Sequence, residues 1–415
     1  MKETSFKDFI AIQRGHDLPE RKRITGEIPV VGSNGIVGFH NSSKGLVPGV
    51  TIGRSGSIGN INFLKRPYFP LNTTLYVTDF KGNNEKFVYY FLKNFNFSNF
   101  DSGSVQPSLN RNYIYTATIK YPDVDKQEAI AEFLESFDKK IELNQQINKT
   151  IQDIAKTLFK SWFVDFDPVR AKAEGRPTGL SKEISDLFPD SFENSALGEI
   201  PSGWQSKNLG QILTFLGSGK RPKEGASITS DQIPSIGAEN VNFIGNYDYS
   251  KEKYIPRNFY EHLKKKSISI KDYDILIYKD GANIGRSTIF GKGFPHKECT
   301  INEHVHLLRS ESEIQKYLYF YLSTKQSQEY LISLNTASAQ PGINQTQLKT
   351  FNILKPEKKI LEKFDELVAP ILDLIFQNCL ANNILSDIRD TLMPKLISGE
   401  LKISDAESLT DEAGV

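Results

Sequence analysis

Apolar residues recur every three or four positions along two long segments of the chain, 123–163 and 357–398. This spacing places them on one face of an α-helix, so each segment is predicted to form one long helix. In the first segment the apolar positions are Ile130, Leu134, Phe137, Ile141, Ile151, Leu158 and Trp162. In the second they are Ile360, Phe364, Leu367, Ile371, Leu374, Ala381, Leu385, Ile388, Leu392 and Leu396.

Asparagines interrupt both apolar faces, Asn144 and Asn148 in the first helix and Asn378 and Asn382 in the second. A polar residue in a coiled-coil seam lowers stability but fixes the register, so we expect the two helices to pair with each other. Pro370 removes a backbone hydrogen bond inside the second helix, and an irregularity is expected there. A helix of this length would span roughly 60 Å, comparable to about 17 or 18 base pairs of DNA.

The segments before the helices, 1–122 and 201–356, alternate β-forming apolar residues with glycine, asparagine and aspartate turns. This pattern predicts two β-rich globular domains built from short strands. Residues 164–200 are rich in turn formers and are expected to link the helix 123–163 to the second domain. The tail, 399–415, is acidic and polar and is predicted to be disordered.

The chain also contains an internal repeat. Ser-Val-Gln-Pro-Ser-Leu-Asn begins at Ser104, Ser-Ala-Gln-Pro-Gly-Ile-Asn begins 234 positions later at Ser338, and the match continues without a gap to Leu158 and Leu392. Two copies can be related by a pseudo-twofold axis, and twofold-related helices that pack together are antiparallel. The predicted fold is therefore α+β, with two β-rich domains separated by two long antiparallel helices that form a coiled-coil spacer. The β-rich parts match more weakly, and loop 53–59 is aligned with loop 279–285.

Charge is distributed unevenly within a chain whose net charge is only +1. Residues 1–122 carry 15 basic and 8 acidic side chains, and residues 201–356 carry 20 and 14. The remaining residues carry 16 basic and 28 acidic side chains. Two basic domains suggest a polyanionic ligand, whereas the acidic helical segments are expected to avoid it and to face protein partners.

Composition restricts the cellular setting. The sequence has no run of eighteen apolar residues, so no membrane span is predicted. The N-terminus lacks the apolar stretch of a signal peptide. The two cysteines, Cys299 and Cys379, occupy non-equivalent positions of the repeat, which excludes a disulfide framework. The reducing cytoplasm is the expected location.

No catalytic, cofactor-binding or metal-binding set is predicted in this chain. Phe215–Gly219 fits the Phe-x-Gly-x-Gly loop of amino-methyltransferases, but the Asn/Asp-Pro-Pro-Tyr/Phe loop that such enzymes also need is missing. A zinc site at His296, Cys299, His304 and His306 would serve only one copy of the repeat, because the first copy has Arg66, Phe69, Thr74 and Tyr76 at the equivalent positions.

Several segments resemble the specificity subunits of type I restriction–modification enzymes. They are Trp-Phe-Val-Asp-Phe-Asp-Pro-Val-Arg-Ala-Lys at 162–172, Leu-Phe-Pro-Asp-Ser-Phe at 187–192, Leu-Gly-Glu-Ile-Pro-Ser-Gly-Trp at 197–204 and Leu-Met-Pro-Lys-Leu-Ile-Ser-Gly-Glu-Leu at 392–401. The Gln-Pro-x-φ-Asn element before each long helix, where φ is an apolar residue, also resembles the family. The resemblance covers nearly the whole chain, although Gly-Glu-Ile-Pro-x-Gly-Trp does not precede the first domain.

The resemblance implies a non-catalytic subunit with two target-recognition domains, each reading one half of a split, asymmetric site on double-stranded DNA. It implies that the paired helices set the spacer and dock two adenine-methyltransferase subunits, which bring S-adenosylmethionine. Restriction subunits that use ATP and magnesium would join through the complex.

Candidate DNA-binding residues are polar or basic side chains in turn-rich loops, since Arg, Lys, Asn and Gln suit contacts to base edges and phosphates. In the first domain they are Arg14, His16, Arg21, Lys22, Arg23, Asn34, Arg54, Ser55 and Ser57. In the second they are Lys220, Arg221, Lys223, Asn240, Lys279, Asn283 and Arg286. Arg54 and Arg286 are the strongest candidates because each lies in a loop bounded by glycines. Gln106 and Gln340 recur in both copies, which favours a structural or phosphate-binding role.

Two other classes of protein remain open. A methyltransferase or nuclease fused to target-recognition domains would need a cofactor or metal motif in this chain. A coiled-coil scaffold whose β-rich domains bind protein or sugar would show no salt-dependent affinity for DNA.

Overall fold

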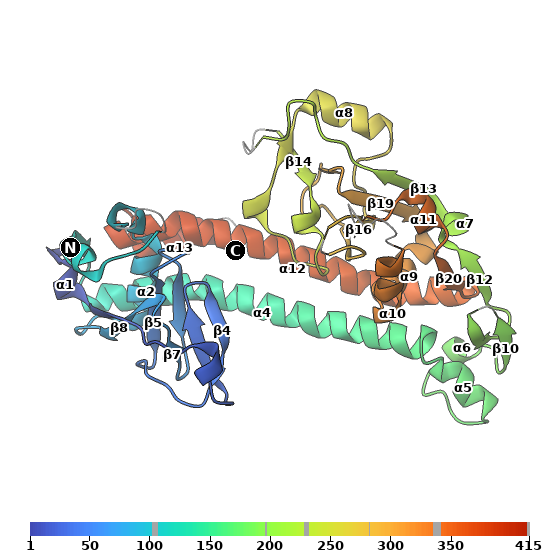
Figure 1. Ribbon diagram of the computed structural model, residues 1–415, viewed down its shortest axis with the longest axis horizontal. Helices are drawn as coiled ribbons and strands as arrows, with labels where there is room; N and C mark the ends of the chain where they lie inside the picture. Colours follow the sequence, from blue (N-terminus) through green and yellow to red (C-terminus); the bar gives the residue numbers. More distant parts are fainter. Residues whose placement is uncertain (102–106, 196, 228–231, 282, 335–341, 413–415) are drawn as a thin grey trace. The chain divides into compact units, whose positions relative to one another are not determined.

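The structure is a computed structural model that describes residues 1–101, 107–195, 197–227, 232–281, 283–334 and 342–412. The chain divides into two compact units. The first comprises Met1–Ile141 and Ile384–Val415, and the second comprises Glu142–Asn383. Two long helices, α4 (Val124–Phe163) and α12 (Lys358–Ser398), contribute residues to both units (Figure 1).

The first unit is built around two small sheets. A four-stranded sheet has the order β2-β8-β5-β6, and a three-stranded sheet has the order β4-β3-β7. The strands are β2 (Ala11–Arg14), β3 (Ile28–Gly32), β4 (Gly35–His40), β5 (Gly49–Gly53), β6 (Ile61–Leu64), β7 (Phe69–Pro70) and β8 (Thr74–Asp79). A separate antiparallel pair joins β1 (Lys2–Ser5) to β9 (Thr118–Tyr121), the strand that precedes α4.

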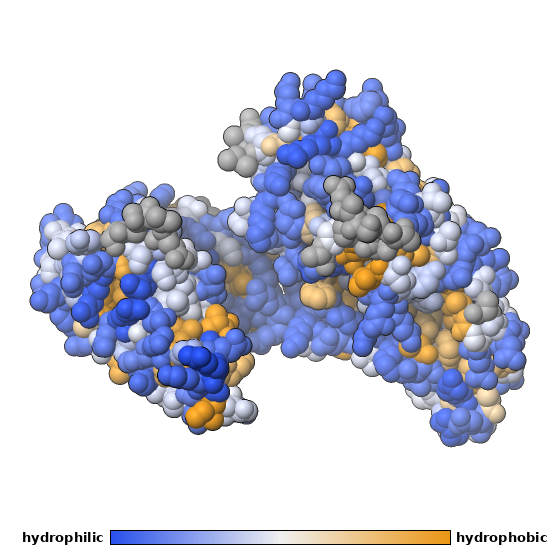
Figure 2. All heavy atoms as spheres, in the orientation of Figure 1, coloured by the Kyte–Doolittle hydropathy of each residue, from blue (hydrophilic) through white to orange (hydrophobic). Residues whose placement is uncertain are grey.

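The helices of the first unit other than α4 and α12 are short. They are α1 (Phe6–Phe9), α2 (Glu85–Asn94), α3 (Arg111–Ile114) and α13 (Ile403–Glu412), with 3₁₀ turns at Glu20–Lys22 and Phe97–Phe100. Asn84 caps α2 by accepting a hydrogen bond from the Phe87 backbone N–H at 2.9 Å. The buried face of α2 packs on β5 and β6 (Figure 1) and carries Phe87, Phe91 and Leu92 into the core. Most of the face seen in Figure 2 is hydrophilic, but three residues of β4, Ile36, Val37 and Phe39, are exposed.

The C-terminal tail is not disordered as predicted over residues 403–412. These residues form α13, and Ala406 is fully buried in the core of the first unit with Leu396 and Ile397 of α12. Leu401 and Ile403 pack against the same core. The sequence does not reveal this apolar face, because the face has only three residues and they stand among acidic ones: Leu401, Ile403 and Ala406.

The second unit repeats the arrangement of the first. A four-stranded sheet has the order β13-β19-β16-β17, and a three-stranded sheet has the order β15-β14-β18. The strands are β13 (Leu213–Ser218), β14 (Ile233–Ile236), β15 (Tyr254–Ile255), β16 (Ile275–Tyr278), β17 (Ser287–Ile289), β18 (Thr300–Ile301) and β19 (Val305–Ser310). The strand β12 (Gln205–Asn208) pairs with β20 (Asn352–Lys355) in the way that β1 pairs with β9.

Helices in the second unit are again short apart from α4 and α12. They are α5 (Asp167–Ala173), α6 (Lys182–Ser185), α7 (Leu209–Ile212), α8 (Arg257–Lys265), α9 (Ser312–Leu322), α10 (Lys325–Ser333) and α11 (Gln345–Lys349), with 3₁₀ turns at Ala238–Asn240 and Tyr249–Lys251. The segment 164–200 also contains a hairpin of β10 (Phe192–Ser195) and β11 (Gly198–Pro201). The core of this unit includes both tryptophans, Trp162 and Trp204.

Within each unit the segments of α4 and α12 run antiparallel. In the second unit Asn144 Nδ2 donates to Asn382 Oδ1 and Asn378 Nδ2 donates to Asn148 Oδ1, both at 2.8 Å. In the first unit Arg389 of α12 pairs with Asp138 of α4. In the two asparagine contacts, the residue number rises from 144 to 148 in α4 and falls from 382 to 378 in α12, as it does in antiparallel helices.

Helix α12 differs from two expectations. It continues without interruption through Pro370, although a proline removes one backbone hydrogen bond, because Val368 before it and Leu372 after it are buried in the core. By length and composition alone it is also the one helix in the described part of the chain that could cross a membrane. One face of it nevertheless packs into the core of the second unit, where Phe364, Leu372 and Phe376 are buried.

Candidate nucleic-acid interface

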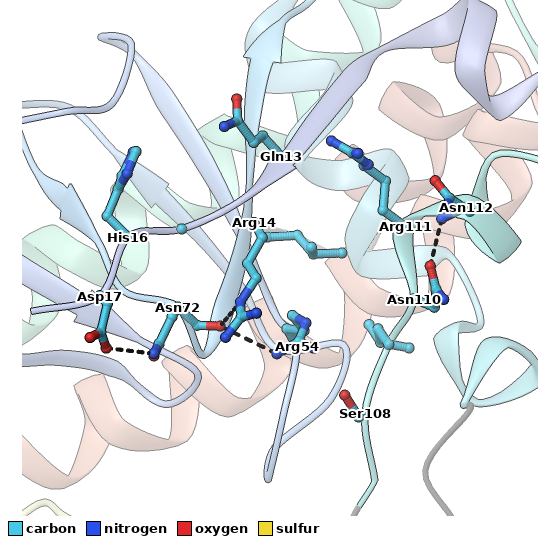
Figure 3. A pocket seen from close by; sticks show the side chains of 13 residues that line it. Gln13, Arg14, His16, Asp17, Arg54, Asn72, Ser108, Asn110, Arg111 and Asn112 are labelled. Carbon is cyan, nitrogen blue, oxygen red and sulfur yellow. Dashed lines mark hydrogen bonds between the residues drawn. The ribbon is translucent and has the colours of Figure 1, made fainter.

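A cavity of about 950 Å³ opens at one edge of the four-stranded sheet in the first unit (Figure 3). Its walls come from the end of β2, the loops that follow β5 and β7, the start of β8 and the segment leading into α3. The lining residues are Gln13, Arg14, Gly15, His16, Asp17, Arg54, Asn72, Leu75, Ser108, Leu109, Asn110, Arg111 and Asn112.

Strand pairing explains why residues distant in sequence meet at this cavity. β2 and β5 both pair antiparallel with β8, so they run parallel to each other and end at the same edge of the sheet. Arg14 is the last residue of β2, and Arg54 directly follows Gly53, the last residue of β5. The segment before α3 closes the third side, because the backbone N–H of Leu109 donates to the carbonyl of Arg54 at 2.9 Å.

The cavity is strongly cationic. Arg14 Nε and Arg54 Nη1 both donate to the backbone carbonyl oxygen of Asn72, each at 3.4 Å. Two like charges are thus held close together, and burial and the neighbouring charge of Arg14 lower the pKa of the Arg54 guanidinium. Asn72 also donates to the carboxylate of Asp17 at 2.9 Å (Figure 3). Clustered guanidinium groups suit phosphate oxygens or the acceptors on a base edge.

His16 occupies the same wall, with its Nε2 atom 3.3 Å from the hydroxyl of Tyr76. Burial, and secondarily the charge of Lys44, lower the pKa of His16. The imidazole is therefore neutral near pH 7 and can exchange hydrogen bonds without adding to the positive charge.

The other predicted residues of the first domain lie outside this cavity. Arg21 and Lys22 are exposed on the 3₁₀ turn Glu20–Lys22. The side chain of Arg23 is engaged, since its Nη1 donates to the carbonyl of Val37 at 2.9 Å. Asn34 is exposed at the turn between β3 and β4.

Ser55 and Ser57 are half-buried in the loop that follows Arg54. The hydroxyl of Ser33 donates to the carbonyl of Ser55 at 2.6 Å and so fastens the β3–β4 turn to this loop. A Cβ atom on Gly53 would lie 2.1 Å from the carbonyl oxygen of Ser57, so only glycine permits the tight return of the loop.

The second unit has a cavity of about 370 Å³ at the equivalent edge of its sheet. β13 and β16 both pair antiparallel with β19, as β2 and β5 do with β8. The residues lining it are Ser218, Lys279, Asp280, His306, Gly342, Ile343, Asn344 and Gln345. Only Lys279 among the predicted residues of the second domain lines this cavity.

The two cavities share one backbone framework. The N–H of Ile343 donates to the carbonyl of Lys279 at 2.7 Å, as that of Leu109 donates to the carbonyl of Arg54. Lys279 is therefore the counterpart of Arg54. By the same strand register Ser218 is the counterpart of Arg14, and the repeat offset makes Gln345 the counterpart of Arg111.

This framework corrects the alignment of loop 53–59 with loop 279–285. The N–H of Gly59 donates to the carbonyl of Gly53, and the N–H of Gly285 donates to that of Tyr278, both at 2.9 Å. Gly53 is thus equivalent to Tyr278, and the second loop is one residue longer. The alignment of 53–59 with 279–285 has no gap for this extra residue, so it pairs Gly53 with Lys279 instead of Tyr278.

Arg54 and Arg286 are consequently not equivalent. Arg286 lies on the returning side of its loop, where its guanidinium donates to the side-chain oxygens of Asn242 and Asn283, both at 2.7 Å. Asn283 is exposed and Arg286 half-buried, and neither lines the cavity.

Four further candidates of the second domain also lie outside the cavity. Lys220 and Lys223 are exposed, and Arg221 lies 4.0 Å from the carboxylate of Glu303. Asn240 is buried, and its amide donates to the backbone carbonyl of Asp248 at 3.2 Å. An inward-facing amide of this kind holds the local backbone rather than a ligand.

Sequence reasoning missed Asn72, Arg111 and Gln345. The last two could have been found, because the offset of 234 pairs them directly after the shared Asn110 and Asn344. Asn72 reaches the cavity only through the loop after β7, and no local pattern marks it. Gln106 and Gln340 lie outside the described residues.

The segments that hold the two cavities both match one protein family. The family model described as "Type I restriction modification DNA specificity domain" matches residues 1–153 and 201–383. The chain is a type I restriction–modification specificity subunit. Specificity subunits are not the catalytic subunits of type I systems, and each matched segment of this one contains one complete cavity.

Relatives and one solved structure agree with this family. The HindI specificity subunit of Haemophilus influenzae is 28% identical over 348 residues, covering 71% of each chain. The MjaIX specificity subunit of Methanocaldococcus jannaschii is 26% identical over 337 residues, covering 77% of this chain and 70% of the relative. The crystal structure of a type I restriction–modification S subunit from M. genitalium has the same fold, with a TM-score of 0.58 at 14% identity over 95% of this chain and 96% of that one.

Proposed function

We propose that this specificity subunit reads a bipartite, asymmetric site on double-stranded DNA, with one half-site bound by each unit. The observation that carries the proposal is the pair of cavities, which have the same backbone framework and different side chains. A shared framework provides the same approach to DNA, whereas different donors and acceptors select different bases. Three arginines line the first cavity, which suits a polyanionic ligand.

The long helices are proposed to set the spacer between the half-sites and to bind two methyltransferase subunits. Apolar residues exposed on α4 support a protein contact, because Leu143, Ile147 and Ile154 remain uncovered in the second unit. Leu367 and Leu374 of α12 are also partly exposed there.

The chemistry is proposed to belong to the partner subunits. S-adenosylmethionine would be bound by the methyltransferase subunits, and ATP and magnesium would be used by restriction subunits that join the complex. The two thiols of this chain suit no nucleophilic role, because burial raises the pKa of both Cys299 and Cys379 to about 12. The complex would act in the cytoplasm, where its DNA substrate lies.

Mapping modified adenines tests the proposal. Genomic DNA from cells that express this chain with its methyltransferase subunit should carry modified adenines within one motif of two defined half-sites and an undefined spacer. Cells that express the methyltransferase subunit alone should lack the motif. Modification that does not depend on this chain, or a motif without two halves, would contradict the proposal.

A further inference from the structure

Three of the positions that the shared framework aligns carry different polar side chains in the two cavities. Asn110 and Asn344 begin the corresponding turns, and each side chain caps them by accepting a backbone hydrogen bond, from Asn112 at 3.0 Å and from Gln347 at 2.9 Å. Next to this fixed residue, Arg111 in the first unit is replaced by Gln345 in the second. The other exchanges, already described, are Arg14 for Ser218 and Arg54 for Lys279.

The exchange of Arg111 for Gln345 is the most informative of the three. Both side chains reach the strand that forms the opposite wall, since Arg111 Nη1 donates to the carbonyl of Ile12 in β2 and Gln345 Nε2 donates to the hydroxyl of Ser218 in β13, each at 3.4 Å. Bonds of this length are weak and leave most of the polar capacity of each side chain available. Figure 3 shows the Arg111 side chain extending across the cavity toward β2.

Arg14 and Arg54 are less suited to base reading. Both donate to the carbonyl of Asn72, and their mutual repulsion favours an anion between them. That arrangement suits a phosphate, which positions a protein on DNA without reporting sequence. Arg111 and Gln345 differ in kind instead, because arginine offers only donors and glutamine offers a donor and an acceptor.

We propose that Arg111 and Gln345 are equivalent specificity-determining residues, with Arg111 selecting a guanine in the half-site of the first unit and Gln345 selecting an adenine in the half-site of the second. The forked donors of arginine match O6 and N7 of guanine, and the amide of glutamine matches N6 and N7 of adenine. This inference rests on the proposed reading of a bipartite site.

The test exchanges the two residues in the full complex. Arg111→Gln and Gln345→Arg each introduce the residue that the other unit carries in the same framework, so the fold should tolerate both. Arg66→Gln is the matched control, because it removes the same charge from an exposed position of the first unit away from the cavity. Modified adenines are then mapped in cells that express each variant with the methyltransferase subunit.

Arg111→Gln should reduce the preference for guanine at one position of one half-site by about ten- to a hundred-fold and leave the other half-site unchanged. Gln345→Arg should change one position of the other half-site alone, and Arg66→Gln should change neither. If Arg111→Gln fails to fold, as judged by circular dichroism, Gln345→Arg decides the question by itself.

Two results would overturn the inference. One is an unaltered motif with both variants, and the other is uniform loss of modification without any change in the preferred base, which marks residues that position DNA. Both results count against the inference only if the unsubstituted chain directs modification of a bipartite motif. If it directs none, the proposed function itself fails.

Discussion

At the residue scale, buried polar groups connect the strands to the segments that close the cavities. His306 is the clearest example, since its Nε2 lies 2.8 Å from the carbonyl of Ile343 and its Nδ1 lies 2.7 Å from the hydroxyl of Ser218. A carbonyl can only accept, so Nε2 carries the proton and Nδ1 accepts from Ser218. Burial is the main cause that lowers the pKa of His306, and the imidazole stays neutral in the folded protein.

This neutral histidine predicts a pH dependence of stability. The folded-state pKa lies below the ordinary value of 6.5, so below pH 6.5 the unfolded chain binds a proton that the folded chain does not. The second unit should therefore lose stability as the pH falls from 7 toward 5. Denaturant midpoints followed by tryptophan fluorescence measure this unit, because both tryptophans, Trp162 and Trp204, lie in its core.

His306→Asn should flatten that dependence, whatever its effect on stability at pH 7. His16→Asn, which alters a histidine of the first unit, should leave the fluorescence-detected slope unchanged. Equal slopes for the unsubstituted chain and His306→Asn would show that His306 does not remain neutral in the folded state.

A second residue-scale prediction concerns Asp138, which joins α4 to both α2 and α12 in the first unit. Its carboxylate accepts from the hydroxyl of Tyr90 at 2.6 Å and pairs with Arg389. Burial and this hydrogen bond raise the pKa of Tyr90, and the phenol stays protonated. Asp138→Ala would leave a half-buried guanidinium with fewer acceptors and should lower the free energy of unfolding by about 1–3 kcal/mol.

Thermal unfolding monitored by circular dichroism, with hydrogen exchange at α2, measures the effect. Glu132→Ala, which removes an exposed carboxylate from the same helix, should stay within about 0.5 kcal/mol of the unsubstituted chain. Equal losses in the two variants would mean that Asp138 contributes only as a surface charge.

At the element scale, the long helices were predictable and the cavities were not. The periodicity that gives α4 and α12 is contained in each segment, and the asparagines that meet across them occur at equivalent positions of the repeat. Arg14 and Arg54 meet only because β2 and β5 both pair with β8, and the β2–β8 pairing joins residues as far apart in sequence as Arg14 and Leu75. The second loop is one residue longer, so the alignment of 53–59 with 279–285 placed Asp280 opposite Arg54, where the structure places Lys279.

The helix α13 gives a test at the same scale. Ala406→Asp would place a carboxylate in the core of the first unit and should lower its stability by about 3 kcal/mol or more. Leu409→Asp makes a similar change on the exposed side of the same helix and should have little effect. The measurement is circular dichroism during thermal unfolding. Equal behaviour of the two variants would indicate that α13 does not pack against the core.

At the scale of the whole molecule, the chain consists of one framework used twice with different side chains. The helix segments and the Asn110 and Asn344 turns follow a single offset without a gap, whereas the strands and loops before them have diverged. The charge distribution follows the same division, with basic β-rich segments and acidic helical ones. We therefore propose that the diverged parts read bases and that the matching parts set the spacer.

Lengthening the helices tests this division most directly. About four residues are inserted near Lys149 in α4 and about four near Gln377 in α12, the antiparallel partner helix. Modified adenines are then mapped in cells that also express the methyltransferase subunit. Four helical residues add roughly 6 Å, or about two base pairs. We expect a spacer longer by about two base pairs between two unchanged half-sites. A changed half-site sequence or an unchanged spacer would contradict the proposed division.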